Sequence, residues 1–198
     1  MYLAPILIAL LGVSAILALI LVLLWREYIE ERGRWLFRAA SCYSQVGLLV
    51  AIVLLCIYSN QPGVPLPNEV KFFLGLILLS FGLALETKGS MDLGVKRSVG
   101  GVCGDELIVK GIYRTIRHPQ NLGGMIWILG VALLANSSYL LFAHLFIWCP
   151  LLVVESYIED MDLKQKFGRE FERYAREVPM FIPRARVRAN IVNNFNIN

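Results

Sequence analysis

The chain has 198 residues, of which 57% are hydrophobic and 17% are charged. An average soluble domain carries about 25% charged residues, so this composition is typical of an integral membrane protein and argues against a soluble globular fold. The formal net charge is +4. Basic residues of this number suit the anionic head groups of lipids, and no nucleic-acid partner is needed to explain them.

Five apolar runs predict an all-α integral membrane fold with about five transmembrane helices. The runs cover residues 3–24, 41–58, 70–86, 122–135 and 139–154. About 20 apolar residues are needed to cross a hydrocarbon core of about 30 Å, so the fourth run is short for a full crossing. Only residues 136–138 separate the last two runs, which predicts a tight helical hairpin whose tip must be covered by protein where it lies within the membrane.

The first run is expected to be a retained span. It follows no basic segment and is longer than the apolar core of a signal peptide. Trp25 and Arg26 at its end are typical of a membrane interface.

The distribution of lysine and arginine predicts the orientation. Segment 25–40, segment 87–120 and the tail after residue 154 together hold 18 of the 19 basic residues. The positive-inside rule then places the N-terminus outside, and these three segments, including the C-terminal tail, in the cytoplasm. We expect two regions: residues 1–90 with the first three spans, and residues 91–198 with the hairpin and the tail.

The four cysteines and two histidines show no spacing that suits zinc, so no metal site is expected. Cys42, Cys56 and Cys149 fall in or beside spans and are interpreted as small packing residues. His144, inside the fifth run, is interpreted as a histidine hydrogen-bonded between helices. Asn136 begins a glycosylation sequon, but the short hairpin turn leaves little room for a modifying enzyme.

The most informative polar segment is Arg117-His118-Pro119, which stands directly before the fourth apolar run. Ionisable groups at membrane depth are costly and indicate a functional site by default. A second polar cluster follows the hairpin, where Glu155 and Glu159 share one face of a helix that continues from the fifth run.

A short amphipathic helix is predicted in the cytoplasmic tail. Phe167, Phe171 and Tyr174 form its apolar stripe, and Val178-Pro179 ends it. We interpret this stripe as the face of a helix that lies on the membrane surface.

Taken together, these clusters resemble the isoprenylcysteine carboxyl methyltransferase family and its phospholipid N-methyltransferase relatives. Five elements agree in order and spacing over about residues 98–184. They are Glu106-Leu107-Ile108, Gly111-x-Tyr113, Arg117-His118-Pro119-x-Asn121-x-Gly123, Glu159-Asp160-x-x-Leu163-x-x-x-Phe167-Gly168-x-x-Phe171-x-x-Tyr174, and Val178-Pro179-x-x-Ile182-Pro183.

The resemblance implies methyl transfer from S-adenosylmethionine to a lipophilic acceptor that enters from the bilayer, with residues 91–198 as the catalytic region. The family's cofactor pocket carries over to Asp105, Glu106, Leu107, Ile108, Tyr113, His118, Pro119, Gln120, Asn121 and Glu159. The catalytic residues expected beside it are Glu155 and Arg117.

The chemistry of these residues agrees in part with such a pocket. Glu159 can accept hydrogen bonds from hydroxyl or amine groups, His118 can donate one, and Tyr113 can supply an aromatic wall. A sulfonium is already a reactive electrophile, so the protein needs mainly to align donor and acceptor and to exclude water. We expect Asp160, on a different helix face, to matter less for cofactor binding than Glu159.

Three positions depart from the family pattern. Asp105 stands where some relatives have histidine, and Asn121 replaces the usual tyrosine. Glu155 stands where members that methylate prenylcysteine carry an arginine for the substrate carboxylate. Because like charges repel in a partly dry site, we expect a membrane lipid or another lipophilic acceptor with an amine or neutral group.

Two other functions remain open from the sequence. Sterol reductases share a related segment around Arg117-His118-Pro119, so an NADPH-linked membrane reductase is one alternative. A non-enzymatic membrane scaffold is the other, although it would leave the polar cluster at the mouth of the hairpin without a role.

Overall fold

The computed structural model describes residues 3–24, 35–58, 61–94 and 107–183, and these are all helix, turn and loop. The elements are α1 (Leu3–Leu24), α3 (Trp35–Ile57), α4 (Asn68–Leu93), the 3-10 helix η1 (Gly111–Arg114), α6 (Pro119–Leu134), α7 (Ser138–Ala143), the π-helical turn η2 (His144–Trp148), α8 (Cys149–Phe167) and α9 (Arg169–Glu177). The predicted all-α fold is therefore confirmed for the described residues.

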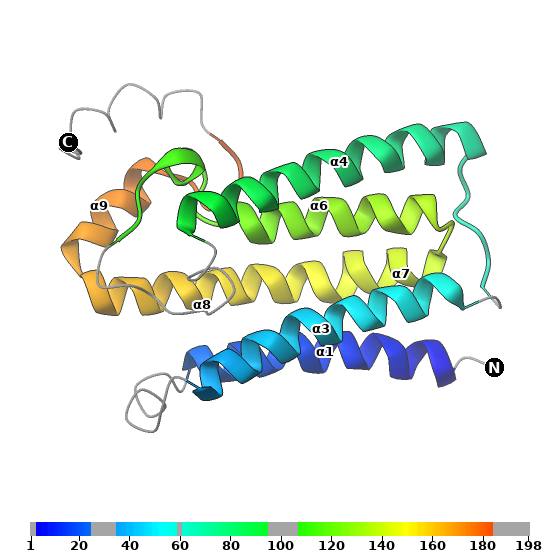
Figure 1. The fold of residues 1–198 in the computed structure, drawn as a ribbon, viewed down its shortest axis with the longest axis horizontal. Helices are drawn as coiled ribbons and strands as arrows, with labels where there is room; N and C mark the ends of the chain where they lie inside the picture. Colours follow the sequence, from blue (N-terminus) through cyan, green and yellow to red (C-terminus); the bar gives the residue numbers. More distant parts are fainter. Residues whose placement is uncertain (1–2, 25–34, 59–60, 95–106, 184–198) are drawn as a thin grey trace.

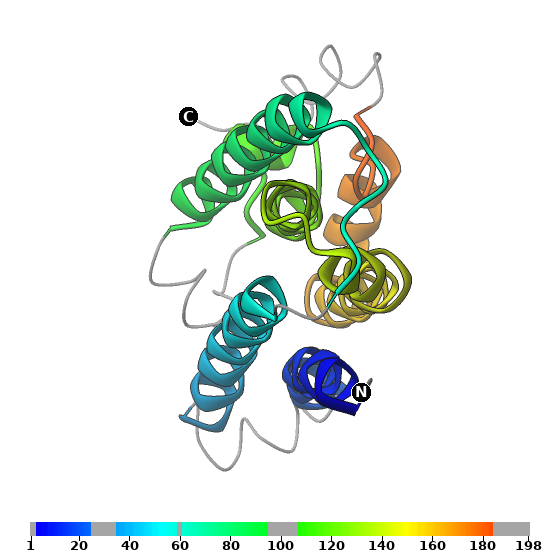
Figure 2. The same cartoon turned by 90° about the vertical axis from the view of Figure 1, so that its right-hand side faces the viewer.

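The long helices lie side by side and alternate in direction, with α9 and η1 together at one end (Figure 1). In the view along the bundle, α6 lies between α4 and α8, while α1 and α3 form a pair next to α8 (Figure 2). The described ends of the chain therefore lie at opposite ends of the bundle.

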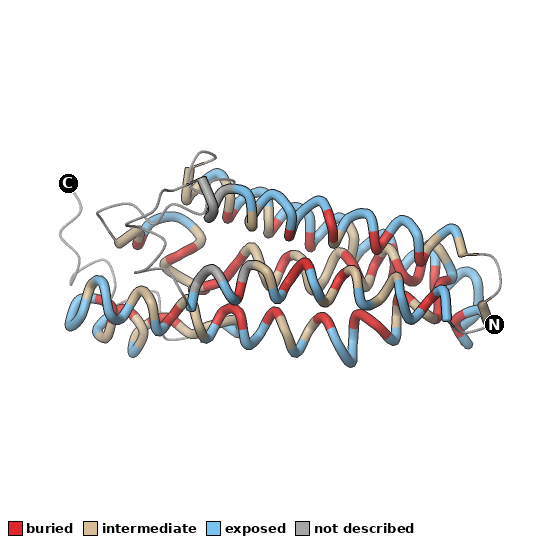
Figure 3. Tube along the Cα trace, turned by 90° about the horizontal axis from the view of Figure 1, so that it is seen from below, coloured by how far each residue is buried: buried red, intermediate tan, exposed pale blue. Residues whose placement is uncertain are grey.

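Two helical stretches of the described residues are long and apolar enough to cross a membrane. They are Asn68–Leu93 and the continuous run Ser138–Phe167, which contains α7, η2 and α8. Shorter apolar helices cover Leu3–Ala18, Cys42–Ile57 and Pro119–Leu134. Exposed positions recur along the helices (Figure 3), and they include large apolar residues, among them Phe73 at 63% and Phe146 at 70% exposure. These are the features of a membrane protein.

The turn between α6 and α7 is covered by the loop that precedes α4. Oε1 of Gln61 accepts a hydrogen bond from the Ser137 hydroxyl at 2.9 Å. Oδ1 of Asn136 accepts from the Val64 amide at 2.9 Å and from Nζ of Lys71 at 2.7 Å. The hairpin tip is therefore covered by protein, as the sequence predicts. The side-chain oxygen of Asn136, the sequon asparagine, is part of this contact.

Glycines allow α4 and α6 to approach until their backbones touch. A Cβ atom on Gly82 would lie 2.4 Å from the Trp127 backbone nitrogen, and one on Gly130 would lie 2.5 Å from that of Leu79. Gly75, Gly82 and Gly89 on α4 recur every seven residues, as do Gly123 and Gly130 on α6. Such rows of small residues drive close helix packing in membranes, where the hydrophobic effect between helices is weak.

The interpretation of His144 is confirmed, because its Nε2 atom lies 2.7 Å from the carbonyl oxygen of Met125 on α6. Among the cysteines, Cys56 packs against the core, and Sγ of Cys149 lies 3.2 Å from the same imidazole nitrogen. Cys42 is exposed on α3, so its interpretation as a packing residue is wrong. Cys103 lies outside the described residues.

The apolar stripe of α9 does not face the membrane surface. Phe171 and Tyr174 are each 3% exposed and pack with Val109 and Val178 in a small cluster of their own. The sequence interpretation of this stripe is therefore wrong. The segment that follows residue 107 supplies the apolar partner that a membrane was expected to supply.

Candidate functional site

His118 lies at the start of α6, held by two segments far apart in the sequence. It occupies the position before Pro119, the first residue of the helix, and is 6% exposed. The backbone amides of Arg117 and His118 donate to the carbonyl oxygens of Pro179 at 3.0 Å and Met180 at 3.2 Å. The two polar motifs therefore meet at one end of the bundle, as the charge distribution predicts.

Two consecutive carboxylates of α8 converge on the His118 ring. Oδ1 of Asp160 lies 2.9 Å from Nε2, and Oε2 of Glu159 lies 3.2 Å from Nδ1. Burial of the ring lowers its pKa, but the hydrogen bonds and charges of both carboxylates outweigh this and raise the pKa of His118 to about 9. His118 is therefore a cationic double donor at neutral pH.

Arg117 ties the tail to this centre. Its guanidinium donates to Oδ2 of Asp160 at 2.7 Å and to the carbonyl oxygens of Ala175 at 2.9 Å and Val178 at 3.1 Å. Its central carbon lies 6.0 Å from the centre of the Phe171 ring. These bonds hold α9 and the following turn in place. They also mean that the partners of the guanidinium are groups of the protein itself.

Tyr113 is buried in η1 beside the carboxylates. Its carbonyl oxygen accepts a hydrogen bond from the Tyr174 hydroxyl at 2.8 Å. Burial, together with the negative charges of Glu159 and Asp92, raises the pKa of Tyr113. The tyrosine is therefore a neutral phenol near Glu159, and the hydrogen bond from Tyr174 joins η1 to α9.

The remaining expected cofactor residues divide between two faces of α6. Asn121 faces α8, where its side-chain amide donates to the Ser156 hydroxyl at 2.8 Å. Gln120 faces α4 and donates to the Ser90 hydroxyl at 3.2 Å. Pro119 is buried beside Gly89 on that same side.

Other predicted residues lie around this centre. Glu155 is 8% exposed on α8, one turn before Glu159. Leu107 packs against the α9 cluster, and Ile108 is half-buried. Asp105 and Glu106 lie outside the described residues.

The contacts of Asp160 differ from what the helix faces predict. Glu159 was expected to matter more because the two side chains leave α8 in different directions, yet each reaches a different nitrogen of the same ring. Asp160 is also the closer of the two and has a second partner in Arg117. The expectation that Asp160 matters less therefore loses its geometric basis.

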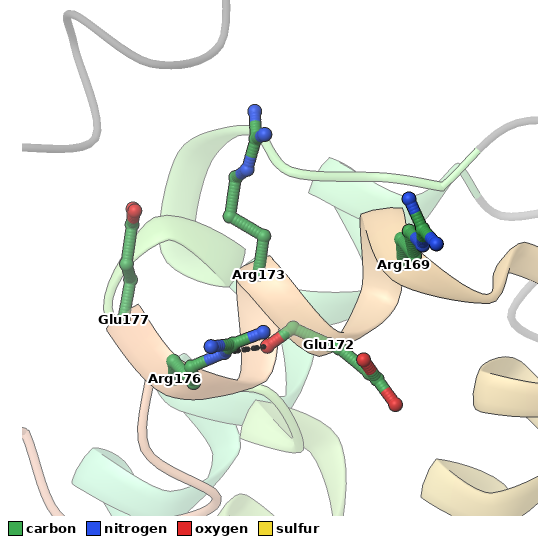
Figure 4. Close-up of a pocket in the computed structure, with 5 residues that line it drawn as sticks. All are labelled: Arg169, Glu172, Arg173, Arg176 and Glu177. Carbon is green, nitrogen blue, oxygen red and sulfur yellow. Dashed lines mark hydrogen bonds between the residues drawn. The ribbon is translucent and has the colours of Figure 1, made fainter.

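A separate hollow of about 470 Å³ lies on the outer face of α9 (Figure 4). Its lining consists of Arg169, Glu172, Arg173, Arg176 and Glu177. The side chain of Glu172 pairs with Lys164 at 3.0 Å, and the two are 40% and 60% exposed. This hollow is a solvated charged surface distinct from the His118 centre.

Comparison with known proteins supports the resemblance found in the motifs. Residues 70–170 match the family described as phospholipid methyltransferase. The chain is 37% identical over 79 residues to a probable protein-S-isoprenylcysteine O-methyltransferase of *Oryza sativa* subsp. *indica*, covering 39% of this chain and 41% of that protein. It is 30% identical over 78 residues to protein-S-isoprenylcysteine O-methyltransferase B of *Arabidopsis thaliana*, covering 39% and 40%.

A further similarity concerns a reductase. The chain is 32% identical over 77 residues to the Delta(14)-sterol reductase of *Mus musculus*, covering 38% of this chain and 18% of that protein. The chain thus matches about two fifths of the length of the two plant methyltransferases and under one fifth of the reductase.

Proposed function

Because the chain belongs to the phospholipid methyltransferase family, we propose that it is an integral membrane enzyme that transfers a methyl group from S-adenosylmethionine to a lipophilic acceptor. The observation that carries the proposal is the convergence of Glu159 and Asp160 on buried His118, inside the matched segment. Such a charged, hydrogen-bonded centre at the end of an apolar bundle is typical of a functional site.

The residues at this centre fit the polar groups of the cofactor. S-adenosylmethionine has a carboxylate, an amine and a ribose diol besides its sulfonium. Glu159 has a side chain that is 45% exposed, and it could leave the His118 ring to accept from an amine or hydroxyl. Nδ1 of the cationic ring would then be available to donate to a carboxylate. The proposed pocket comprises Asp105, Glu106, Leu107, Ile108, Tyr113, His118, Pro119, Gln120, Asn121 and Glu159.

The cofactor, when bound, supplies a methyl group activated by the positive sulfur, so no protein nucleophile is required. In the proposed mechanism, Asp160 keeps the His118 ring oriented and protonated. Arg117 contributes by positioning Asp160 and the tail, while Glu155 faces the acceptor. The apolar bundle excludes water from the reacting atoms.

The acceptor in this proposal is a membrane lipid or another lipophilic molecule without a carboxylate at the reacting end. Glu155 is 8% exposed, and burial favours the neutral form of its carboxyl group. A substrate carboxylate beside it would be buried without a cationic partner, whereas prenylcysteine-methylating relatives offer an arginine there. An amine or a neutral group avoids this cost.

The proposed membrane arrangement has five crossings, with the N-terminus outside and the His118 centre in the cytoplasm. Its support is the alternating direction of the helices in Figure 1 and the distribution of lysine and arginine along the sequence. Residues 91–198 contribute the cofactor pocket, and α4 braces it through its glycine contacts with α6.

An NADPH-linked reductase is the second candidate, favoured by the similarity to the mouse sterol reductase. The methyltransferase similarities cover a larger share of the relatives concerned, and the family match is to a methyltransferase. We therefore rank methyl transfer first.

The test is methyl transfer from labelled S-adenosylmethionine to three acceptors: a farnesylcysteine analogue, an aminophospholipid and a native lipid extract. We expect label in the aminophospholipid or in the lipid extract, and little in the farnesylcysteine. Glu155→Arg should raise farnesylcysteine methylation if Glu155 excludes carboxylates. Efficient methylation of farnesylcysteine by the unmodified protein would refute the proposed acceptor class, and no transfer to any lipid would count against the reaction.

A further inference from the structure

Helix α4 carries an acidic residue at the end of its apolar run, which covers residues 70–86. Glu86 lies seven residues before the end of Asn68–Leu93, which corresponds to about 10 Å at 1.5 Å per residue. It is the only charged residue between Lys71 and Lys88. A half-buried ionisable side chain at the edge of an apolar run is a candidate for a functional site.

The carboxyl group of Glu86 has one hydrogen-bond partner among the described residues. The indole Nε1 of Trp127 on α6 donates to Oε2 at 2.5 Å. No lysine or arginine of the described segments pairs with Glu86, and the side chain is half-buried. One neutral donor satisfies only part of what a carboxyl group requires, so Oε1 has capacity for a further donor.

The backbone fixes Glu86 close to the proposed cofactor pocket. A Cβ atom on Gly123 would lie 2.7 Å from the Glu86 backbone nitrogen, so α4 and α6 are in direct contact here. One turn along α4, Ser90 accepts the hydrogen bond from Gln120. Glu86 therefore lies about one helical turn to the bilayer side of the start of α6, on a rigid support.

A row of leucines continues from Glu86 along α4 toward the middle of the bundle. Leu83, Leu79 and Leu76 precede it by three, seven and ten residues and share its helix face. Leu83 is 44% exposed and Leu76 is 46% exposed. A carboxyl group at one end of an exposed apolar row complements a molecule with a basic head and an apolar chain.

We infer that Glu86 binds the head group of a basic amphiphile, an amine or ammonium on an apolar chain, next to the cofactor pocket. The amine donates to Oε1 while Trp127 holds Oε2. If the Glu86 carboxyl group and the amine are both neutral before binding, the carboxyl proton moves to the amine nitrogen and the same ion pair results. Delivery of an acceptor to the cofactor rests on the proposed function, whereas binding at Glu86 does not.

The test compares the binding of dodecylamine, dodecanol and dodecanoate to the full chain in detergent micelles by native mass spectrometry. Glu86→Gln keeps an oxygen for Trp127 and removes the acid, and Glu86→Asp keeps the acid. Glu69→Gln is the matched control, because Glu69 is an exposed glutamate in the first turn of the same helix.

We expect the unmodified protein, Glu86→Asp and Glu69→Gln to bind dodecylamine about 10-fold or more tighter than dodecanol, and Glu86→Gln to lose this preference. Equal preference in Glu86→Gln and the unmodified protein would overturn the inference, as would preferential binding of dodecanoate.

S-adenosylhomocysteine binding, measured on the same samples, separates the two proposals. If it binds to every variant while the amine preference is absent, the inference about Glu86 fails and the proposed function stands. If it does not bind to any variant while the amine preference depends on Glu86, the proposed function fails and the amphiphile site stands.

Discussion

His118 and Asp160 are joined by a 2.9 Å contact between Nε2 and Oδ1, while Glu159 approaches the other ring nitrogen. A histidine between two carboxylates is held in its charged form, and both carboxylates gain an oriented donor. The contact links the start of α6 to α8 over 42 positions of sequence separation. Both the stability and the proposed binding properties of this end of the protein depend on it.

The first prediction concerns the protonation of His118. The pKa of His118 in the folded protein is about 9, above the ordinary histidine value of 6.5. The resulting stabilisation, about 3 kcal/mol, is fully present below pH 6.5 and is lost as the pH rises through about 9. NMR titration of labelled histidine in micelles should show the raised pKa, and Asp160→Asn should lower it. A midpoint near 6.5 in the unmodified protein would contradict this prediction.

The sequence predicted the helices and the motif residues of the His118 centre, but it did not predict which side chains contact one another there. The apolar runs predicted the long helices because hydrophobic length is a property of a local segment. The motif residues likewise indicated that His118 and Glu159 belong to one site. The contact of Asp160 was not predicted, because a helical face gives only the direction in which a side chain leaves its own helix. The His118 ring has two nitrogens, so it can contact carboxylates that approach from two directions.

Two other features depend on long-range packing. An amphipathic stripe shows that α9 must bury one face, but it cannot distinguish a membrane from the segment near Val109 that covers Phe171. No prediction was drawn from the seven-residue spacing of Gly75, Gly82 and Gly89, although small residues at such spacing favour close helix contact. Its partner on α6 became identifiable only with the fold.

The second prediction concerns Arg117 as the anchor of the tail. Arg117→Ala removes donors from Asp160 and from two carbonyl groups of the α9 end. Because the guanidinium side chain is only 13% exposed, we expect a loss of about 3 kcal/mol in the free energy of unfolding. Thermal unfolding in micelles and limited proteolysis near Val178 measure this change. The exposed Arg173 is the control, and its change to alanine should cost less than about 0.5 kcal/mol; equal effects of the two substitutions would argue against the anchor.

The third prediction uses two adjacent glycines of α6. A Cβ atom on Gly123 would lie 2.7 Å from backbone atoms of Gly82 and Glu86, whereas one on Gly124 would meet nothing within 4 Å. Gly123→Ala should therefore destabilise the protein by about 1–3 kcal/mol through overpacking. Gly124→Ala should be neutral or stabilising by up to about 1 kcal/mol, because alanine favours the helix. Thermal unfolding of the pair tests this, and a stable Gly123→Ala protein would show that the α4–α6 contact tolerates separation.

The fourth prediction concerns orientation. Cys103 belongs to the basic segment 87–120, which the proposed arrangement places in the cytoplasm. A membrane-impermeant maleimide should modify Cys103 in inside-out vesicles and leave it unmodified in right-side-out vesicles. Labelling of the solubilised protein provides the control for thiol reactivity. Modification from the outside alone would reverse the proposed orientation.

The central claim is that the His118 centre belongs to a pocket for S-adenosylmethionine. Its most direct test is equilibrium binding of S-adenosylhomocysteine and of NADPH to the purified protein and to His118→Ala and Glu159→Ala. We predict that S-adenosylhomocysteine binds, that NADPH does not, and that each substitution weakens S-adenosylhomocysteine binding about 10- to 150-fold, as expected for the loss of a hydrogen bond to a charged group. Binding of NADPH in place of S-adenosylhomocysteine, or unchanged affinity in both variants, would contradict the account.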